Sequence, residues 1–171
     1  MSPHELAAVS DAVQAYFGRL TRQGVATSSS AVSGELPEFD YTGMVGVSGT
    51  YSGCIYFTAP KLMLRYLLLA AGETLQGDDI FLDTAGEIAH TIAKRASQHY
   101  GARMEISPPS HHKGAGVRGT EIGKQLREQP STVICIQWQA LLGALVVDLA
   151  RSDGQAGDSA ASASSSEPVS A

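Results

Sequence analysis

The chain has 171 residues, 43% of them hydrophobic, and a formal net charge of −5. This length and composition predict a single domain around one sizeable core. The negative charge argues against a general nucleic-acid or anionic-membrane surface, because both require basic patches. No secretory signal is visible and no apolar stretch reaches the roughly 20 residues that span a bilayer, so we expect a cytoplasmic protein.

A helix is the first predicted element, within residues 1–23. Ser2, Pro3 and Glu5 are typical of a helix start with a capping box, in which the serine and the glutamate cap each other's backbone. Apolar residues then recur at helical spacing and predict one buried stripe: Leu6, Val9, Val13, Tyr16, Phe17 and Leu20. Residues 24–35, with three consecutive serines, are predicted to form a flexible connection.

The period changes after residue 36. The pattern predicts a hairpin with strands within residues 39–47 and 54–58, and then a largely buried helix over residues 61–71. An acidic loop leads to a further helix that includes residues 86–94 and ends at Gly101.

The last third of the chain predicts a β-rich region. A short strand over residues 103–107 is followed by a long polar loop at 110–130, in which a strand around 117–122 is left open, and then by a hairpin of residues 132–138 and 144–149. The order of the predicted elements, with runs of adjacent strands, favours an α+β fold with an antiparallel-rich sheet and helices packed against it. The Ser/Ala-rich residues 151–171 predict a disordered tail.

The two cysteines and the two adjacent histidines are not predicted to form a functional site. Cys54 and Cys135 each lie in an apolar run, which favours buried free thiols. His111 and His112 would point to opposite faces of a strand and have no nearby carboxylate at ligand spacing, so we predict no metal site. The glycines of residues 114–119 lack the strand and helix that flank a phosphate loop.

The helix over residues 86–94 has the most informative face. At about 100° per residue, Glu87, His90, Thr91 and Lys94 gather on one side, while alanines and isoleucines gather on the other. The apolar side predicts a core face. The polar side faces either solvent or a partner, and the spacing is compatible with both.

Several segments form one informative set: residues 39–43, Gly49, residues 53–60, the Gly-Glu-Ile-Ala motif at 86–89, and residues 106–108. Together these segments resemble those of the CheX-like chemotaxis phosphatases. The resemblance extends from about residue 36 to 150, and the motif is its most specific part. It implies an α+β fold whose sheet associates across a homodimer, and hydrolysis of the phosphoaspartate of a CheY-like response-regulator receiver.

The resemblance also assigns roles. In such proteins a Glu-x-x-Asn helix docks into the receiver, where the Glu pairs with a lysine and the Asn orients the attacking water. Glu87 then occupies the anchoring position and His90 the position of the Asn, with Thr91 and Lys94 on the docking face. The protein would need no cofactor of its own, because the Mg²⁺ belongs to the receiver.

Two residues depart from the family pattern. His90 replaces the Asn, and Lys94 stands where the family often has Gly. A neutral imidazole still offers one donor and one acceptor, as a water-orienting amide does. Three hypotheses follow: a phosphatase with a Glu-x-x-His motif, a receiver-binding module without hydrolysis, and a dimeric domain whose polar face is only solvated.

Overall fold

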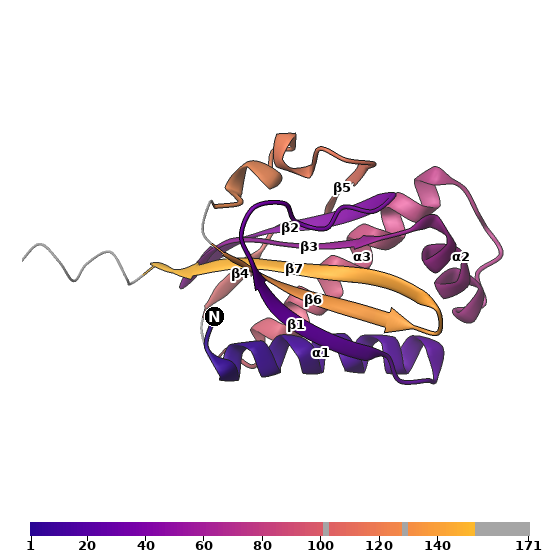
Figure 1. Cartoon of the computed structure of the whole chain (residues 1–171), viewed down its shortest axis with the longest axis horizontal. Coiled ribbons are helices and arrows are strands. Elements are labelled where there is room, and N and C mark those ends of the chain that lie inside the picture. The colour runs from indigo at the N-terminus through magenta and orange to yellow at the C-terminus, as the bar shows by residue number, and fades with distance from the viewer. Residues whose placement is uncertain (101–102, 128–129, 153–171) are drawn as a thin grey trace, which may run out of the picture.

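The computed structural model describes residues 1–100, 103–127 and 130–152. Within these ranges the chain forms three helices and one antiparallel sheet, which confirms the α+β prediction (Figure 1). The elements are α1 (Pro3–Thr21), β1 (Ala26–Val32), β2 (Tyr41–Gly49), β3 (Tyr51–Ala59), α2 (Lys61–Ala70), α3 (Asp78–Ser97), β4 (Met104–Ile106), β5 (Ser110–Lys113), β6 (Ser131–Trp138) and β7 (Leu141–Arg151). Two short 3₁₀ turns, Val117–Gly119 and Gly123–Gln125, lie between β5 and β6.

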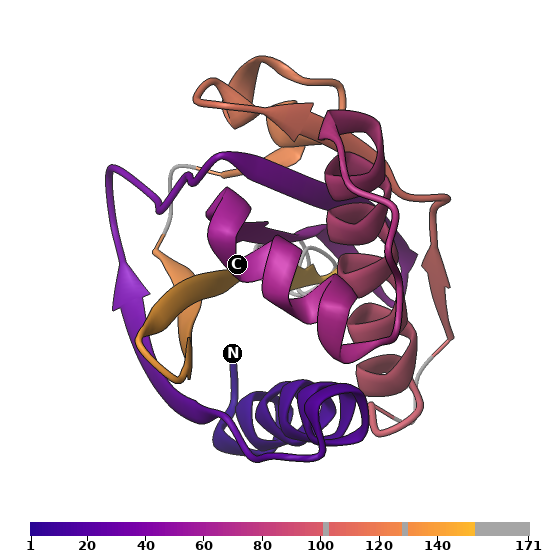
Figure 2. The same ribbon diagram turned by 90° about the vertical axis from the view of Figure 1, so that its right-hand side faces the viewer.

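The sheet has the strand order β1-β6-β7-β3-β2-β4, and β5 also pairs with β2. The helices gather on one side of this curved sheet (Figure 2). The main core lies between them and includes Phe17 of α1, Leu64 of α2, Ile88 of α3 and Phe57 of β3. Burial of these apolar side chains is the principal force that holds the helical layer on the sheet.

A smaller core covers the other face of the sheet. Met44, Tyr56 and Val146 lie there beneath Val117 and Leu126, which come from the segment after β5. An ion pair between Arg127 and the buried Asp148 of β7 holds the end of this segment. The segment therefore forms part of the fold, although its polar composition predicts a long loop.

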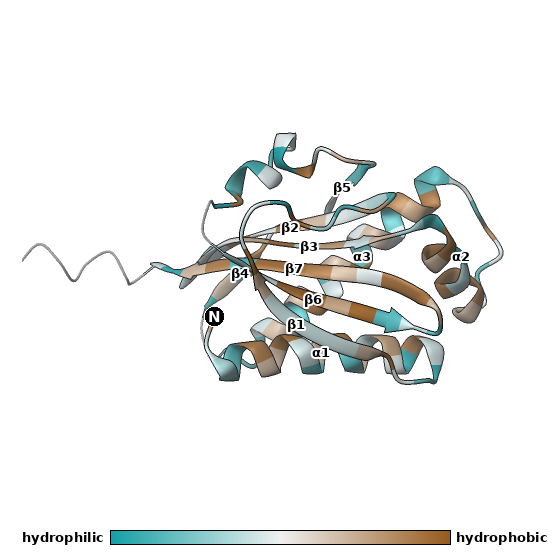
Figure 3. Cartoon of the chain, viewed as in Figure 1, coloured by the Kyte–Doolittle hydropathy of each residue, from teal (hydrophilic) through white to brown (hydrophobic). Residues whose placement is uncertain are grey.

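Three differences from the sequence prediction have local causes. Residues 26–32, predicted as part of a flexible connection, form the edge strand β1. This strand is mostly exposed, and its serine-rich sequence, pale in Figure 3, lacks the alternation of apolar and polar residues that would predict a strand. Residues 117–122 form no strand, because the Glu38 carboxylate accepts hydrogen bonds from the Gly116 and Val117 backbone and fixes a turn. Asp78 and Asp79 begin α3, where acidic side chains favour the helix N-terminus.

The predicted burial of both cysteines is half right. Cys54 is buried, but Cys135 of β6 is exposed. Cys135 lies on the same face of β6 as Val133, beyond the part of the sheet that the smaller core covers. The apolar run around Cys135 does not indicate how much of this face of the sheet the smaller core covers.

Strand β7 and the residue after it extend slightly beyond the predicted boundary at residue 150. Ser152 donates hydrogen bonds to the carbonyl oxygens of Thr50 and Gly49, so the chain stays on the sheet after β7. The rest of the predicted tail, residues 153–171, lies outside the described residues. No helix within the described ranges combines the length and apolarity needed to cross a bilayer.

Candidate functional site

The position of α3 is set by a close contact with β2. A Cβ atom at Gly43 would lie 2.1 Å from the carbonyl carbon and oxygen of Ala85, so the strand and helix backbones touch where no side chain intervenes. Ala85, Ile88 and Ile92 are fully buried on this side of the helix. The opposite side of α3 therefore faces outward. The contact with the β2 backbone fixes the distance of the helix from the sheet.

The four predicted site residues lie together on this outward side. Glu87, Thr91 and Lys94 are exposed, and His90 is half-buried. One helical turn separates Glu87 from His90, a rise of about 4.5 Å along the axis. Within the described ranges, none of these four side chains forms a hydrogen bond or an ion pair, so all of them can meet a partner.

One flank of this face is formed by β5 and the residues before it. Pro109 would lie 3.2 Å from a Cβ atom at Gly86, one residue before Glu87. His111 Nε2 lies 3.7 Å from Asp83 Oδ1, one turn before Glu87 on α3. His112 points elsewhere, with Nε2 2.7 Å from the Ala115 carbonyl oxygen. Among the described residues, no three His, Cys, Asp or Glu side chains form a metal-binding group.

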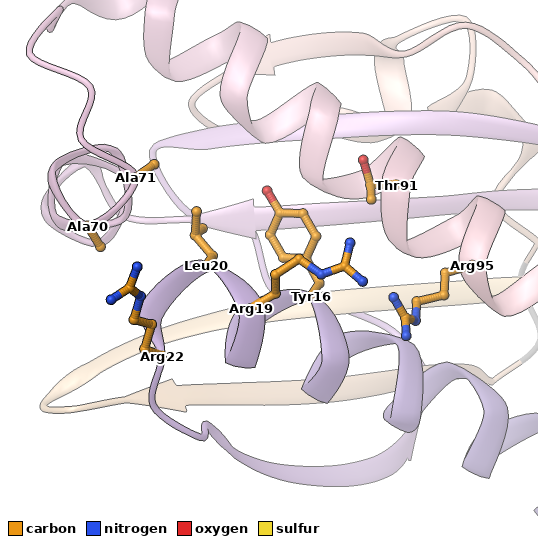
Figure 4. Close-up of a pocket in the computed structure, with 8 residues that line it drawn as sticks. All are labelled: Tyr16, Arg19, Leu20, Arg22, Ala70, Ala71, Thr91 and Arg95. Atoms are coloured by element: carbon orange, nitrogen blue, oxygen red, sulfur yellow. The ribbon is translucent and has the colours of Figure 1, made fainter.

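The other flank is a groove between α1, α3 and the C-terminal end of α2. Tyr16 and Leu20 of α1 divide it into two adjoining pockets. The larger, of about 390 Å³, is lined by Thr91 and by three arginines (Figure 4): Arg19, Arg22 and Arg95. The smaller, of about 280 Å³, includes Glu87 and Asp83 in its lining.

Tyr16 connects the groove electrostatically to the polar face of α3. Burial and, second, the charge of Glu87 raise the pKa of Tyr16 to about 12. Its hydroxyl therefore stays protonated as a hydrogen-bond donor at neutral pH. The sequence predicts Tyr16 only as a core residue, because its spacing fits the apolar stripe of α1. Only the packing of α1 against α3 brings it beside Glu87.

Comparison with known proteins identifies the family. The family described as chemotaxis phosphatase CheX matches residues 41–133, more than half of the chain. The chain belongs to the CheX family. This confirms the family on which the resemblance rested, and the matched segment contains β2, β3, α2, α3 and the whole Glu87 face.

Solved structures share the CheX fold at low sequence identity. A CheC-like superfamily protein from Shewanella sp. PV-4 has a TM-score of 0.73 at 11% identity, with 88% of this chain and 99% of that chain covered. CheX from Vibrio vulnificus has a TM-score of 0.71 at 14% identity, covering 85% and 99%. CheX in the CheX–CheY–BeF₃–Mg²⁺ complex from Borrelia burgdorferi has a TM-score of 0.66 at 12% identity, covering 85% and 97%. No curated protein matches the chain.

Proposed function

We propose that this CheX-family protein hydrolyses the phosphoaspartate of a CheY-like receiver domain through the Glu-x-x-His face of α3. The observation that carries the proposal is the exposed Glu87, which has no ion-pair partner among the described residues and lies next to His90 on a helix within the family match. The Borrelia burgdorferi relative, which was solved in complex with CheY, BeF₃ and Mg²⁺, supports a receiver as the partner. The proposal includes a homodimer and a cytoplasmic location, where receivers would be met.

Hydrolysis of a phosphoaspartate requires mainly that the protein position the attacking water. An acyl phosphate is already activated, so a helper accelerates its hydrolysis by holding water in line with the phosphorus. Glu87 anchors the helix on a cationic group of the receiver. The neutral imidazole of His90 accepts a hydrogen bond from the water or donates one to it, and so fixes its direction of attack. The Mg²⁺ that neutralises the phosphoryl oxygens is held by the receiver.

The test is the decay rate of a phosphorylated receiver with and without the protein. We expect the wild type to accelerate decay, and His90→Ala to lower that acceleration about 100-fold, because a misplaced water loses the benefit of orientation. His99→Ala, at an exposed histidine beyond the C-terminus of α3, is the matched control and should retain activity. A His90→Ala protein with wild-type activity would remove His90 from the mechanism.

The second candidate function is binding of a receiver without hydrolysis. Lys94 favours it, because this exposed cation lies one turn after His90 on the same face, where the family often has Gly. In that case the wild type would bind the receiver but leave its decay rate unchanged. The double variant His90→Asn/Lys94→Gly would then gain hydrolysis, whereas continued inactivity would contradict a site lost only through these two changes.

A further inference from the structure

The larger pocket of the groove concentrates positive charge in a chain that is negative overall. Arg19 lies in the last turn of α1, Arg22 caps that helix, and Arg95 lies in the last turn of α3. All three line the same pocket, although about 70 residues of chain separate Arg95 from the other two (Figure 4). The pocket therefore depends on the packing of α1 beside α3.

These three guanidinium groups have no acidic partner within the described part of the chain. The ion pairs formed there involve His111, Lys113, Lys124 and Arg127. Three like charges at one pocket repel one another unless anions compensate them. Guanidinium groups are also the cations best suited to hold carboxylates, because their paired donors match two oxygens at once.

The adjoining pocket carries the opposite charge. Glu73, Asp83 and Glu87 line it, while Tyr16 and Leu20 form the boundary between the two. The groove is therefore acidic beside the Glu87 end of the face and basic beside Thr91. A partner surface with one cationic and one acidic region fits this polarity in a single orientation, because the reverse orientation brings like charges together.

We propose that the basic pocket binds carboxylate side chains of an acidic segment on the receiver that docks on Glu87. This inference rests on the proposed function for the identity of the partner. Arg19, Arg22 and Arg95 supply paired donors to the carboxylates, and the Tyr16 and Thr91 hydroxyls supply further hydrogen bonds from the walls. Leu20, Ala70 and Ala71, which also line the pocket, provide apolar contacts for the stems of the acidic side chains. The pocket thereby fixes which way the receiver lies on α3.

The experiment measures binding and hydrolysis separately. The CheY-like receivers of the source organism are purified, activated with BeF₃ and Mg²⁺, and titrated with the full-length protein at low and high salt. For Arg19→Glu/Arg95→Glu we expect Kd to rise at least about tenfold, and the salt dependence of Kd to weaken, because charged contacts are lost. In the decay assay KM should rise while kcat at saturation stays unchanged.

Two further variants separate recognition from folding and from general charge. Arg19→Lys/Arg95→Lys keeps the charge and should keep most of the affinity. Arg118→Glu reverses a single charge at an exposed arginine beside the smaller core, on the other face of the sheet, and should leave Kd unchanged. Circular dichroism verifies that each variant is folded.

The outcomes distinguish this inference from the proposed function. If the wild type hydrolyses the phosphorylated receiver and the double Arg→Glu variant matches Arg118→Glu in Kd, the pocket has no role and the proposed function stands. If the wild type binds a receiver without hydrolysing it and the double variant loses that binding, the pocket is confirmed and hydrolysis is refuted. Failure of the wild type to bind any receiver overturns both.

Discussion

Asp78 fastens the first turn of α3 to two strands. Its carboxylate accepts hydrogen bonds from the Lys113 ammonium of β5 and from the Tyr41 hydroxyl of β2. These two hydrogen bonds, with that from Lys113 the stronger influence, hold the pKa of Asp78 below its ordinary value of 3.8. A lowered carboxylate pKa means that the folded state favours the ionised form. The resulting stability is present above pH 3.8 and is lost as the pH falls through the lowered value.

The Asp78→Asn variant tests this contact. We expect it to be less stable than the wild type at neutral pH, and the difference in unfolding free energy to shrink as the solution becomes acidic. Urea denaturation at a series of pH values measures it. Asp79→Asn, an exposed neighbour in the same helical turn, is the control and should show little of this pH dependence. A difference that stays constant into acid solution would contradict the role of the Asp78 charge.

Arg127 and Asp148 form the most deeply buried ion pair described. Asp148 is 1% exposed, and its Oδ1 accepts from Arg127 Nε at 2.9 Å and Nη2 at 2.6 Å. Its Oδ2 accepts from the Arg127 backbone nitrogen at 2.6 Å. The pair joins the segment over the smaller core to the central strand β7.

Removal of the arginine side chain leaves a buried, largely uncompensated carboxylate. We therefore expect Arg127→Met to lower the unfolding free energy by about 3 kcal/mol, as broken buried pairs do. Arg127→Met/Asp148→Leu replaces both partners with apolar groups and should recover most of that loss. Chemical denaturation of both variants measures the effect. Equal destabilisation by the single and the double substitution would show that packing, not charge, is decisive.

At the scale of elements, substitution of two glycines by alanine should change the stability of the fold in opposite directions. Gly43→Ala places a methyl group against the α3 backbone, which must move, so we expect a loss of at least about 2 kcal/mol. Gly18 lies inside α1 with no atom within 4 Å of a Cβ position. Gly18→Ala should therefore gain up to about 1 kcal/mol from its higher helix propensity. Thermal unfolding of both variants measures the difference, and a neutral Gly43→Ala would contradict the backbone contact.

The elements with strong periodicity were predictable, and those defined by pairing were not. The amphipathic pattern of residues 85–96 predicts both the buried side of α3 and the shared face of Glu87 and His90. Strand β1 has no such pattern, because an exposed edge strand gains its stability from backbone pairing with β6. The basic pocket was also inaccessible to sequence reasoning, since it depends on a contact between helices far apart in the chain.

At the scale of the whole molecule, the first 35 residues join the main core. Val9, Val13 and Phe17 of α1 are at most 1% exposed, and β1 pairs with the edge of β6 along its length. The sequence predicts residues 36–150 as the domain, with the first helix and the connection outside it. The packing instead predicts that the domain depends on both.

A chain that begins at residue 36 tests this dependence. Without α1 it exposes the apolar side chains that Phe17 and Val13 cover, and without β1 it leaves the β6 edge unpaired. We expect it to aggregate or to unfold at a clearly lower temperature than the full chain. Size-exclusion chromatography and calorimetry measure both effects. A monodisperse fragment with the full-length melting temperature would contradict the prediction.

Two of the three arginines of the groove come from α1, whereas Glu87 and His90 come from α3. Residues 41–133, which match the family, include α3 but not α1. Under the two proposals, the hydrolytic residues and most of the arginines that orient the receiver are therefore encoded in separate stretches of the gene. After a gene duplication, substitutions confined to α1 would redirect one copy to a new receiver while its chemistry stayed intact. A set of signalling pathways in one cell could diverge in this way without the loss of a working phosphatase at any step.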